Sequence, residues 1–190
     1  MIRSKSELVE YIQADNNFLL QTSKKGKMIS IFAYYPTYVL KKYLKFLRKQ
    51  EYYINTAEEN KLKGFLGVYY ERRKNKLGVR LGIEIGPNCF GKGLSIYHVG
   101  NTIINPAVRV GDYCKLHGGN CIGNNGKIEE VPHLGNNVDI GFGAVIVGDI
   151  IIADNIKIGA NAFVNRSFTE KGCTIAGIPA TIVKKTNDNF

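Results

Sequence analysis

The sequence predicts a mainly β protein, a parallel β-helix that follows a small α-helical region. Up to about residue 80, apolar residues recur at three- and four-residue steps, as they do on one face of an α-helix. Beyond that point, aliphatic residues recur every six residues. Six residues are too few for a helix pair or a propeller blade but fit one face of a β-helix coil. We therefore expect a basic α-helical region over residues 1–80 and a β-helix domain over residues 81–190.

The first region should contain three helical stretches. Ser4 and Glu7 have the spacing of a capping box at the start of the first stretch. Pro36 opens the second, and the third spans about residues 57–73. The apolar face of the second stretch consists of Val39, Leu40, Tyr43, Leu44 and Leu47.

The six-residue repeat should place one aliphatic side chain per strand inside the β-helix. Successive coils then stack about 4.8 Å apart through backbone hydrogen bonds. The segment 123–133 is polar yet keeps the six-residue count, so it is either a coil or an excursion, and His133 is interpreted as a surface residue. The repeat positions are Ile104, Val110, Leu116, Ile122, Ile128, Leu134, Ile140, Ile146, Ile152, Ile158 and Val164.

The net charge of +10 belongs to the first part of the chain. Residues 1–80 hold 17 Lys and Arg against 7 Asp and Glu, whereas residues 81–190 hold 9 of each. This distribution argues against a uniformly basic nucleic-acid binder. The lysines and arginines are interpreted as solvated helix faces, although the basic region 1–80 could still bind an anionic partner.

No apolar run is long enough for a membrane span, and no secretory signal is visible, so a cytoplasmic protein is expected. The four cysteines form no CxxC pair and are predicted to be buried thiols. They are Cys89, Cys114, Cys121 and Cys173.

Besides the six-residue repeat, the second part of the chain contains the sequences GLSIYH at 93–98, IINPA at 103–107, IGFGA at 140–144 and AGIPA at 176–180. Through these motifs, residues from about 77 to 183 resemble the hexapeptide-repeat acyltransferases, and within them the serine O-acetyltransferases. The chain looks most like the short relatives associated with capsule and exopolysaccharide gene clusters. The resemblance implies a left-handed coil, acetyl-CoA as the donor, and homotrimers with an active site in each cleft between neighbouring β-helices.

Acetyl transfer to a hydroxyl requires a base, and neutral histidine suits that task near pH 7. His98 falls six residues before Ile104, where an inward aliphatic would otherwise stand, so it should line a cleft. The resemblance also implies that His98 is the catalytic base. The serine enzymes have Asp directly before this histidine and a second histidine before a proline, where this chain has Tyr97 and Val131.

The acceptor site is expected to involve Glu84, Tyr97 and His117. Glu84 matches an acidic residue of the family's acceptor pocket, Tyr97 offers a ring and a hydroxyl to a sugar, and His117 should lie at a turn. Glu84, Glu129 and Glu130 are candidates to orient His98, and each could equally be a solvated carboxylate.

Coenzyme A should bind along small residues of the later coils. The family match points to Gly141, Phe142, Gly143, Gly159 and Ala160 for the pantetheine arm. Two lysines near the end of the chain, Lys184 and Lys185, could pair with the nucleotide phosphates or belong to a flexible tail.

These features predict an acetyl-CoA-dependent O-acetyltransferase that uses no metal. A saccharide of surface polysaccharide assembly is favoured as the acceptor, with L-serine as the alternative. A zinc enzyme of the γ-carbonic anhydrase kind is disfavoured because His98, His117 and His133 lack its spacing. A non-catalytic β-helix scaffold is the remaining alternative.

Overall fold

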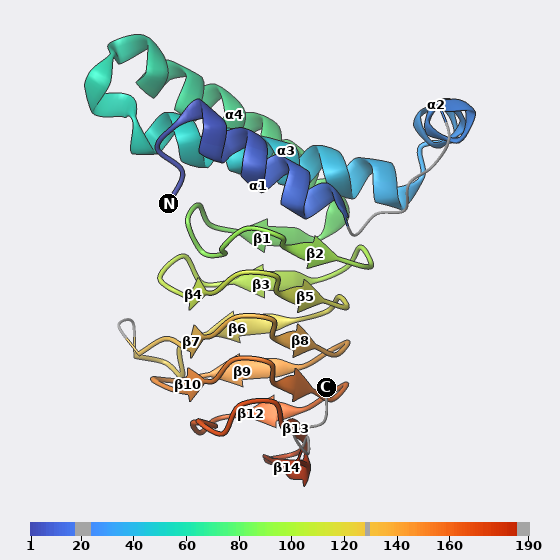
Figure 1. Cartoon of the computed structure of the whole chain (residues 1–190), viewed down its shortest axis with the longest axis vertical. Helices are drawn as coiled ribbons and strands as arrows, with labels where there is room; N and C mark the ends of the chain where they lie inside the picture. Colours follow the sequence, from blue (N-terminus) through green and yellow to red (C-terminus); the bar gives the residue numbers. More distant parts are fainter. Residues whose placement is uncertain (18–23, 128–129, 186–190) are drawn as a thin grey trace.

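The computed structural model describes residues 1–17, 24–127 and 130–185. It shows a tall stack of short strands lying beneath a layer of helices (Figure 1). The helices are α1 (Lys5–Asn17), α2 (Lys24–Phe32), α3 (Pro36–Asn55) and α4 (Lys61–Leu81), with a short 3₁₀ turn at Ala57–Glu59.

The capping box predicted at the start of the first helix is present. The Glu7 backbone N–H donates to Ser4 Oγ at 3.1 Å, and the Ser4 N–H donates to Glu7 Oε2 at 2.9 Å. The apolar face predicted for the second stretch is the buried face of α3. The third stretch runs further than predicted, to Leu81, and ends at Gly82 in the left-handed conformation. Helix α2 was not predicted.

The strands form three flat faces, which we call A, B and C, and each coil crosses them in that order. All pairings are parallel except the final hairpin of β13 and β14. Face A contains β1 (Ile83–Ile85), β3 (Thr102–Ile104), β6 (Cys121–Gly123), β9 (Val145–Val147) and β12 (Phe163–Val164). Face B contains β4 (Arg109–Val110), β7 (His133–Leu134) and β10 (Ile151–Ile152). Face C contains β2 (Ser95–Ile96), β5 (Lys115–Leu116), β8 (Asp139–Ile140), β11 (Lys157–Ile158), β13 (Thr174–Gly177) and β14 (Ala180–Lys184).

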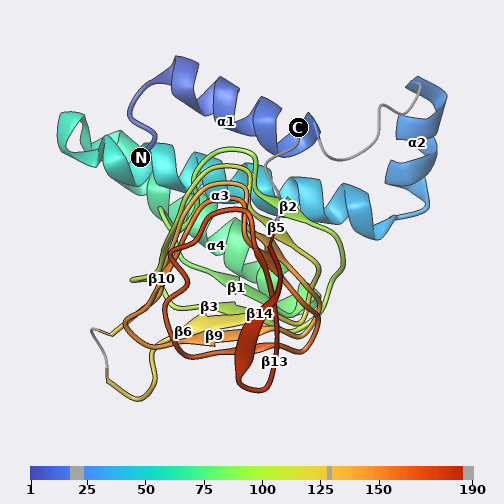
Figure 2. The same ribbon diagram turned by 60° about the horizontal axis from the view of Figure 1, so that its bottom comes forward.

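The predicted aliphatic ladder fills the interior of the coils. Figure 2 shows the stacked coils from below. Every repeat position in the described residues is buried. Ile128 lies outside the described residues. Burial of these branched side chains, at about 25 cal/mol per Å² of apolar surface, is the main force that holds the coils together.

The register shows that the segment 123–133 contains an excursion. Phe163 pairs with Val145, eighteen positions earlier, whereas Val145 pairs with Cys121, twenty-four positions earlier. One coil therefore holds six extra residues between β6 and β7. Because the excursion has the length of one repeat, the six-residue count passes through it unbroken. His133 lies on β7 and faces outward, rather than in a loop.

A buried ionic network joins the helices to the first coil. Arg48 is fully buried and pairs with Asp15 at 2.8 Å and Glu51 at 2.9 Å. Its guanidinium also donates to two backbone carbonyls of the first coil. Asp15 in turn accepts the N–H groups of Gly93 and Leu94, just before β2. Burial alone would lower the pKa of Arg48, but the two carboxylates raise it above its ordinary value.

Three of the four cysteines are buried as predicted, and Cys121 is half-exposed on the outer side of face A. Among the described residues, no helix is both long and apolar enough to cross a membrane.

Candidate active site

The predicted histidine, glycine and aromatic site residues meet at one edge of the β-helix. We call it the histidine edge, and it consists of the corners that follow face C, residues 97–101, 117–120, 141–144 and 159–162. Parallel pairing places Ile96, Leu116, Ile140 and Ile158 above one another. The residues that follow them are therefore also stacked. One row is Tyr97, His117, Gly141 and Gly159, and the next is His98, Gly118, Phe142 and Ala160.

His117 is held between an aromatic ring and a carboxylate. Its ring stacks on Tyr97, with centroids 4.5 Å apart and an interplanar angle of 8°. Its Nε2 lies 2.8 Å from Asp139 Oδ1. Desolvation, and to a smaller extent Asp139, raise the pKa of the Tyr97 hydroxyl above its ordinary value. These contacts fix the orientation of a partly exposed imidazole.

His98 is exposed in the corner after β2 and does not stand at the inward position that the six-residue count from Ile104 would give it. Ile96 fills the interior there, because the corner 97–101 is longer than those below it. The corner is tied to the helices by a hydrogen bond of 2.9 Å from the Gly100 N–H to the Leu81 carbonyl. Within the described residues, His98 makes no hydrogen bond or ion pair, so its ring is available to a substrate.

Phe142 lies beside His98, across two glycines. A Cβ placed on Gly118 would lie 3.3 Å from His98 Cβ and 3.6 Å from the Phe142 ring. One placed on Gly119 would lie 3.3 Å from the same ring. Both glycines also have positive φ, which other residues rarely adopt. The pair thus lets an exposed aromatic ring cover the backbone next to the histidine.

A buried amide holds this corner in place. Asn120 is fully buried, and its Oδ1 accepts the Gly118 N–H at 3.1 Å while its Nδ2 donates to the Gly141 carbonyl at 2.7 Å. The corner that carries His117 is thereby bound to the coil below.

The small residues proposed for coenzyme binding lie on the same edge. A Cβ on Gly141 would lie 2.6 Å from the Ala160 nitrogen, and one on Gly159 would lie 2.8 Å from Ala176 Cβ. Stacking of the coils therefore already requires glycine at both positions, whatever binds outside. Gly143 has positive φ, and its N–H donates to the Gly118 carbonyl at 3.0 Å.

Glu84 lies on the outer side of β1, which pairs with the strand that follows the His98 corner. A hollow of about 450 Å³ beside it is also lined by Lys74 and Asn101. Burial lowers the pKa of Lys74, whose Nζ donates to the Ile85 carbonyl at 2.7 Å. Glu84 thus shares a hollow with Asn101, the last residue of the corner that carries His98.

Other predicted residues lie away from this edge. Lys184 pairs with the start of β13, and Lys185 forms an ion pair of 3.0 Å with Glu170. Both lysines are at the opposite side of face C. Glu130 lies in the excursion between faces A and B, where a hydrogen bond from Lys127 lowers its pKa, so within one chain it cannot orient His98. Glu129 lies outside the described residues.

Among the described residues, no group of three His, Cys, Asp or Glu side chains is placed to hold a metal ion. His133 faces outward from face B, between Arg109 and Ile151, whereas His98 and His117 lie on the histidine edge.

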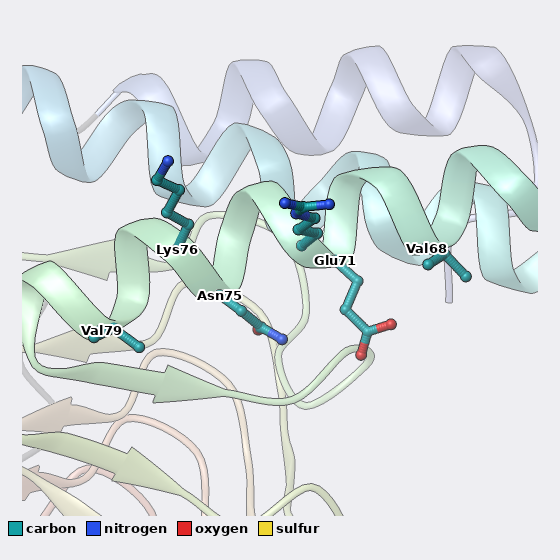
Figure 3. A pocket seen from close by; sticks show the side chains of 6 residues that line it. Val68, Glu71, Asn75, Lys76 and Val79 are labelled. Carbon is teal, nitrogen blue, oxygen red and sulfur yellow. The ribbon is translucent and has the colours of Figure 1, made fainter.

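A separate hollow of about 460 Å³ lies along the outer side of α4. In Figure 3, Glu71 and Asn75 point from the helix toward the first coil, and Lys76 points to the opposite side. The hollow contains neither histidine of the histidine edge, so we do not assign it to the active site.

Sequence reasoning missed Asp139 and Asn120. The register places Asp139 on the outer side of face C between Lys115 and Lys157, so a lone acidic residue in a basic row was the available signal. Asn120 gave no signal, because its role depends on how two corners stack.

No model of a known protein family matches the chain. A serine acetyltransferase of Synechococcus elongatus is 37% identical over 108 residues, which are 55% of this chain and 44% of that protein. A serine acetyltransferase of Helicobacter pylori is 38% identical over 107 residues, which are 55% of this chain and 62% of that protein. The match thus spans about half the length of these relatives.

Solved serine acetyltransferases have a similar structure. The enzyme of Brucella abortus strain S19 in complex with coenzyme A superposes with a TM-score of 0.67 and 23% identity, over 96% of this chain and 68% of that one. The soybean enzyme complexed with serine gives a TM-score of 0.68 and 19% identity, over 94% and 68% of the two chains. The likeness confirms the predicted fold, a left-handed parallel β-helix with an N-terminal helical region.

Proposed function

We propose that the protein transfers the acetyl group of acetyl-CoA to the hydroxyl of L-serine at the histidine edge. The observation that carries this proposal is an exposed histidine, His98, that has no partner among the residues the structure describes and lies next to a second histidine held by Asp139. Both stand on a fold shared with serine acetyltransferases. The curated relatives bear that same name.

His98 acts as the general base in this proposal. Its imidazole takes the proton of the serine hydroxyl while the oxygen attacks the thioester carbonyl carbon. Collapse of the tetrahedral intermediate breaks the carbon–sulfur bond, and the imidazolium returns the proton to the departing thiolate. No acetyl-enzyme is formed. The buried thiol of Cys114 is unsuited to act as a nucleophile, because burial raises its pKa well above the ordinary value.

The acceptor differs from the saccharide that the sequence favoured. That expectation rested on Tyr97 and Val131 standing where the serine enzymes have Asp and His, and on Tyr97 as a stacking platform for a sugar. One face of the Tyr97 ring is covered by His117. The comparisons give no support for polysaccharide chemistry and favour serine. The missing Asp and His at positions 97 and 131 are offset by the pair that His117, on the histidine edge, forms with Asp139 of β8. Val131 is buried and is part of the hydrophobic core.

An amino acid needs partners for two charges. Asp139 and Glu84 offer carboxylates for the ammonium group, and Lys115 and Lys157, exposed on either side of Asp139, offer cations for the carboxylate. Unpaired buried charges cost several kcal/mol, so these partners decide whether serine can bind.

Acetyl-CoA would lie along the later corners of the edge. Gly141, Gly143, Gly159 and Ala160 present little side chain there, and the ring of Phe142 is 54% exposed beside them. Lys184 and Lys185 are too far along face C to join this group within one chain.

A homotrimer would complete the site. The outer side of face A carries a row of apolar residues, Ile103, Cys121, Val145 and Phe163, directly beyond the histidine edge. A neighbouring β-helix that covers this row would bury apolar surface and form the second wall of a cleft over His98.

The test is thiol release from acetyl-CoA with L-serine, with L-alanine as the matched control that lacks the hydroxyl, and with a panel of saccharides. Turnover with L-serine at a KM between about 1 μM and 1 mM is expected. Turnover with a saccharide and none with L-serine would overturn the choice of acceptor.

A further inference from the structure

The stretch from Asn16 to Gln50 is basic without interruption. It contains seven lysines and Arg48 and no Asp or Glu. Arg48 is neutralised by its buried ion pairs with Asp15 and Glu51, so the lysines carry the net charge of this stretch. The active-site proposal uses none of them.

The middle of this stretch exposes a cluster of large apolar side chains, residues 28–35, which we call the apolar tip. Phe32 is 96% exposed and Met28 is 71% exposed, and two tyrosines in the turn that follows are more than half exposed. The members are Met28, Ile29, Ile31, Phe32, Tyr34 and Tyr35. A contiguous exposed apolar cluster of this kind marks an interaction surface.

The apolar tip projects away from the rest of the protein. Figures 1 and 2 both show α2 beyond the first turn of α3, to the side of the β-helix. A tight turn with positive φ at Tyr34, closed by the Tyr35 N–H to Ser30 carbonyl bond of 3.0 Å, joins the two helices. Lys42 and Lys45 are exposed on the adjoining turns of α3. Exposed cations therefore follow the apolar tip within the first three turns of α3.

We propose that the apolar tip and the neighbouring lysines dock on an anionic lipid surface. Lysines beside exposed aliphatic and aromatic residues are the composition of helices that lie in a membrane interface, and tyrosine favours the headgroup layer. At nine residues, α2 is far too short to span the bilayer. A second copy of the chain fits poorly, because two acid-free lysine-rich stretches would repel each other.

The test uses the full chain and vesicles of phosphatidylcholine with or without phosphatidylglycerol, separated by sedimentation. Binding to the anionic vesicles is expected, with little binding to the neutral ones and weaker binding as salt is added. The double variant Lys42→Gln and Lys45→Gln should bind about 25-fold more weakly, since each lysine at an anionic surface contributes about fivefold. The control, Lys61→Gln and Lys76→Gln on α4, removes the same charge from exposed positions and should bind as the parent does.

A second pair of variants tests the apolar contribution. Met28→Ser with Phe32→Ser should weaken vesicle binding at least about tenfold, because two large side chains no longer leave water. The control, Phe65→Ser with Val79→Ser, changes exposed residues of α4 and should leave vesicle binding unchanged. Failure of the parent protein to bind anionic vesicles would overturn the proposal. So would an equal loss of vesicle binding in the Met28, Phe32 variant and in its α4 control. A lower molecular mass in solution for the Met28→Ser with Phe32→Ser variant than for the parent protein would also overturn the proposal, and would show that the apolar tip joins two copies of the chain.

Discussion

At the scale of single residues, the histidine edge combines one histidine that has no hydrogen-bond or ion-pair partner in the described part of the chain with one whose ring is held in place. No described residue orients the His98 ring through a hydrogen bond or ion pair, whereas the His117 ring is oriented by Tyr97 and Asp139. The sequence identified His98 through a family resemblance and as a residue that lines a cleft, although the six-residue count gave it an inward position that Ile96 fills instead. For Asp139 it offered one signal, a lone acidic residue in a basic row, but not the contact with His117, which lies 22 positions away and meets Asp139 through strand register.

Replacing His98 with Ala should lower acetyl transfer by at least about a hundredfold, because general-base catalysis contributes that much or more. The melting temperature should stay near that of the parent, since the side chain is exposed and makes no described contact. Steady-state kinetics and thermal melting check both statements. Retention of most of the activity would show that another group is the base.

Replacing Asp139 with Asn should raise the KM for the acceptor about tenfold, with a smaller change in the KM for acetyl-CoA. The reason is that a charged partner contributes about 1.5–3 kcal/mol to a hydrogen bond that orients the imidazole. His117→Gln should have a similar effect, and the double variant should be little worse than either. Additive losses would mean that the two residues act separately.

At the scale of elements, the six-residue period predicted the strands, their inward residues and the stacking of coils. It failed where a coil departs from eighteen residues. The excursion before β7 went undecided because its extra length equals one repeat, and the longer corner at 97–101 shifted the phase of His98. Helix α2 escaped prediction because its apolar residues are exposed and show no buried face.

Inserting one residue after Ile146 should destabilise the protein by more than about 3 kcal/mol, since every later aliphatic would leave the core phase. An insertion after Gly126 should cost far less, because a Cβ there meets open space and the excursion is outside the coil. Denaturant unfolding compares the two. Equal tolerance would be incompatible with the register described above.

At the scale of the whole molecule, the helical layer and the β-helix share one hydrophobic core, and the Arg48 network crosses their junction. The charge split between residues 1–80 and 81–190 was visible in the sequence. The ion pairs were not, because Asp15 and Arg48 are 33 positions apart and Arg48 looked like one more surface cation.

Replacing Arg48 with Met should therefore destabilise the fold by about 3–5 kcal/mol, because Asp15 and Glu51 would be left buried without a cation. Arg72→Met, at an exposed position of α4, is the matched control and should change the free energy of unfolding by less than about 0.5 kcal/mol. Similar values for the two variants would mean that water or a rearrangement satisfies the carboxylates.

The location of bound coenzyme A tests the central claim most directly, because the account depends on the histidine edge being the place of transfer. A crystal structure with coenzyme A is predicted to show the pantetheine arm along Gly141 and Gly159, with the thiol beside His98. Coenzyme A bound in the hollow on α4, or on face B, with the histidine edge left free would contradict the account.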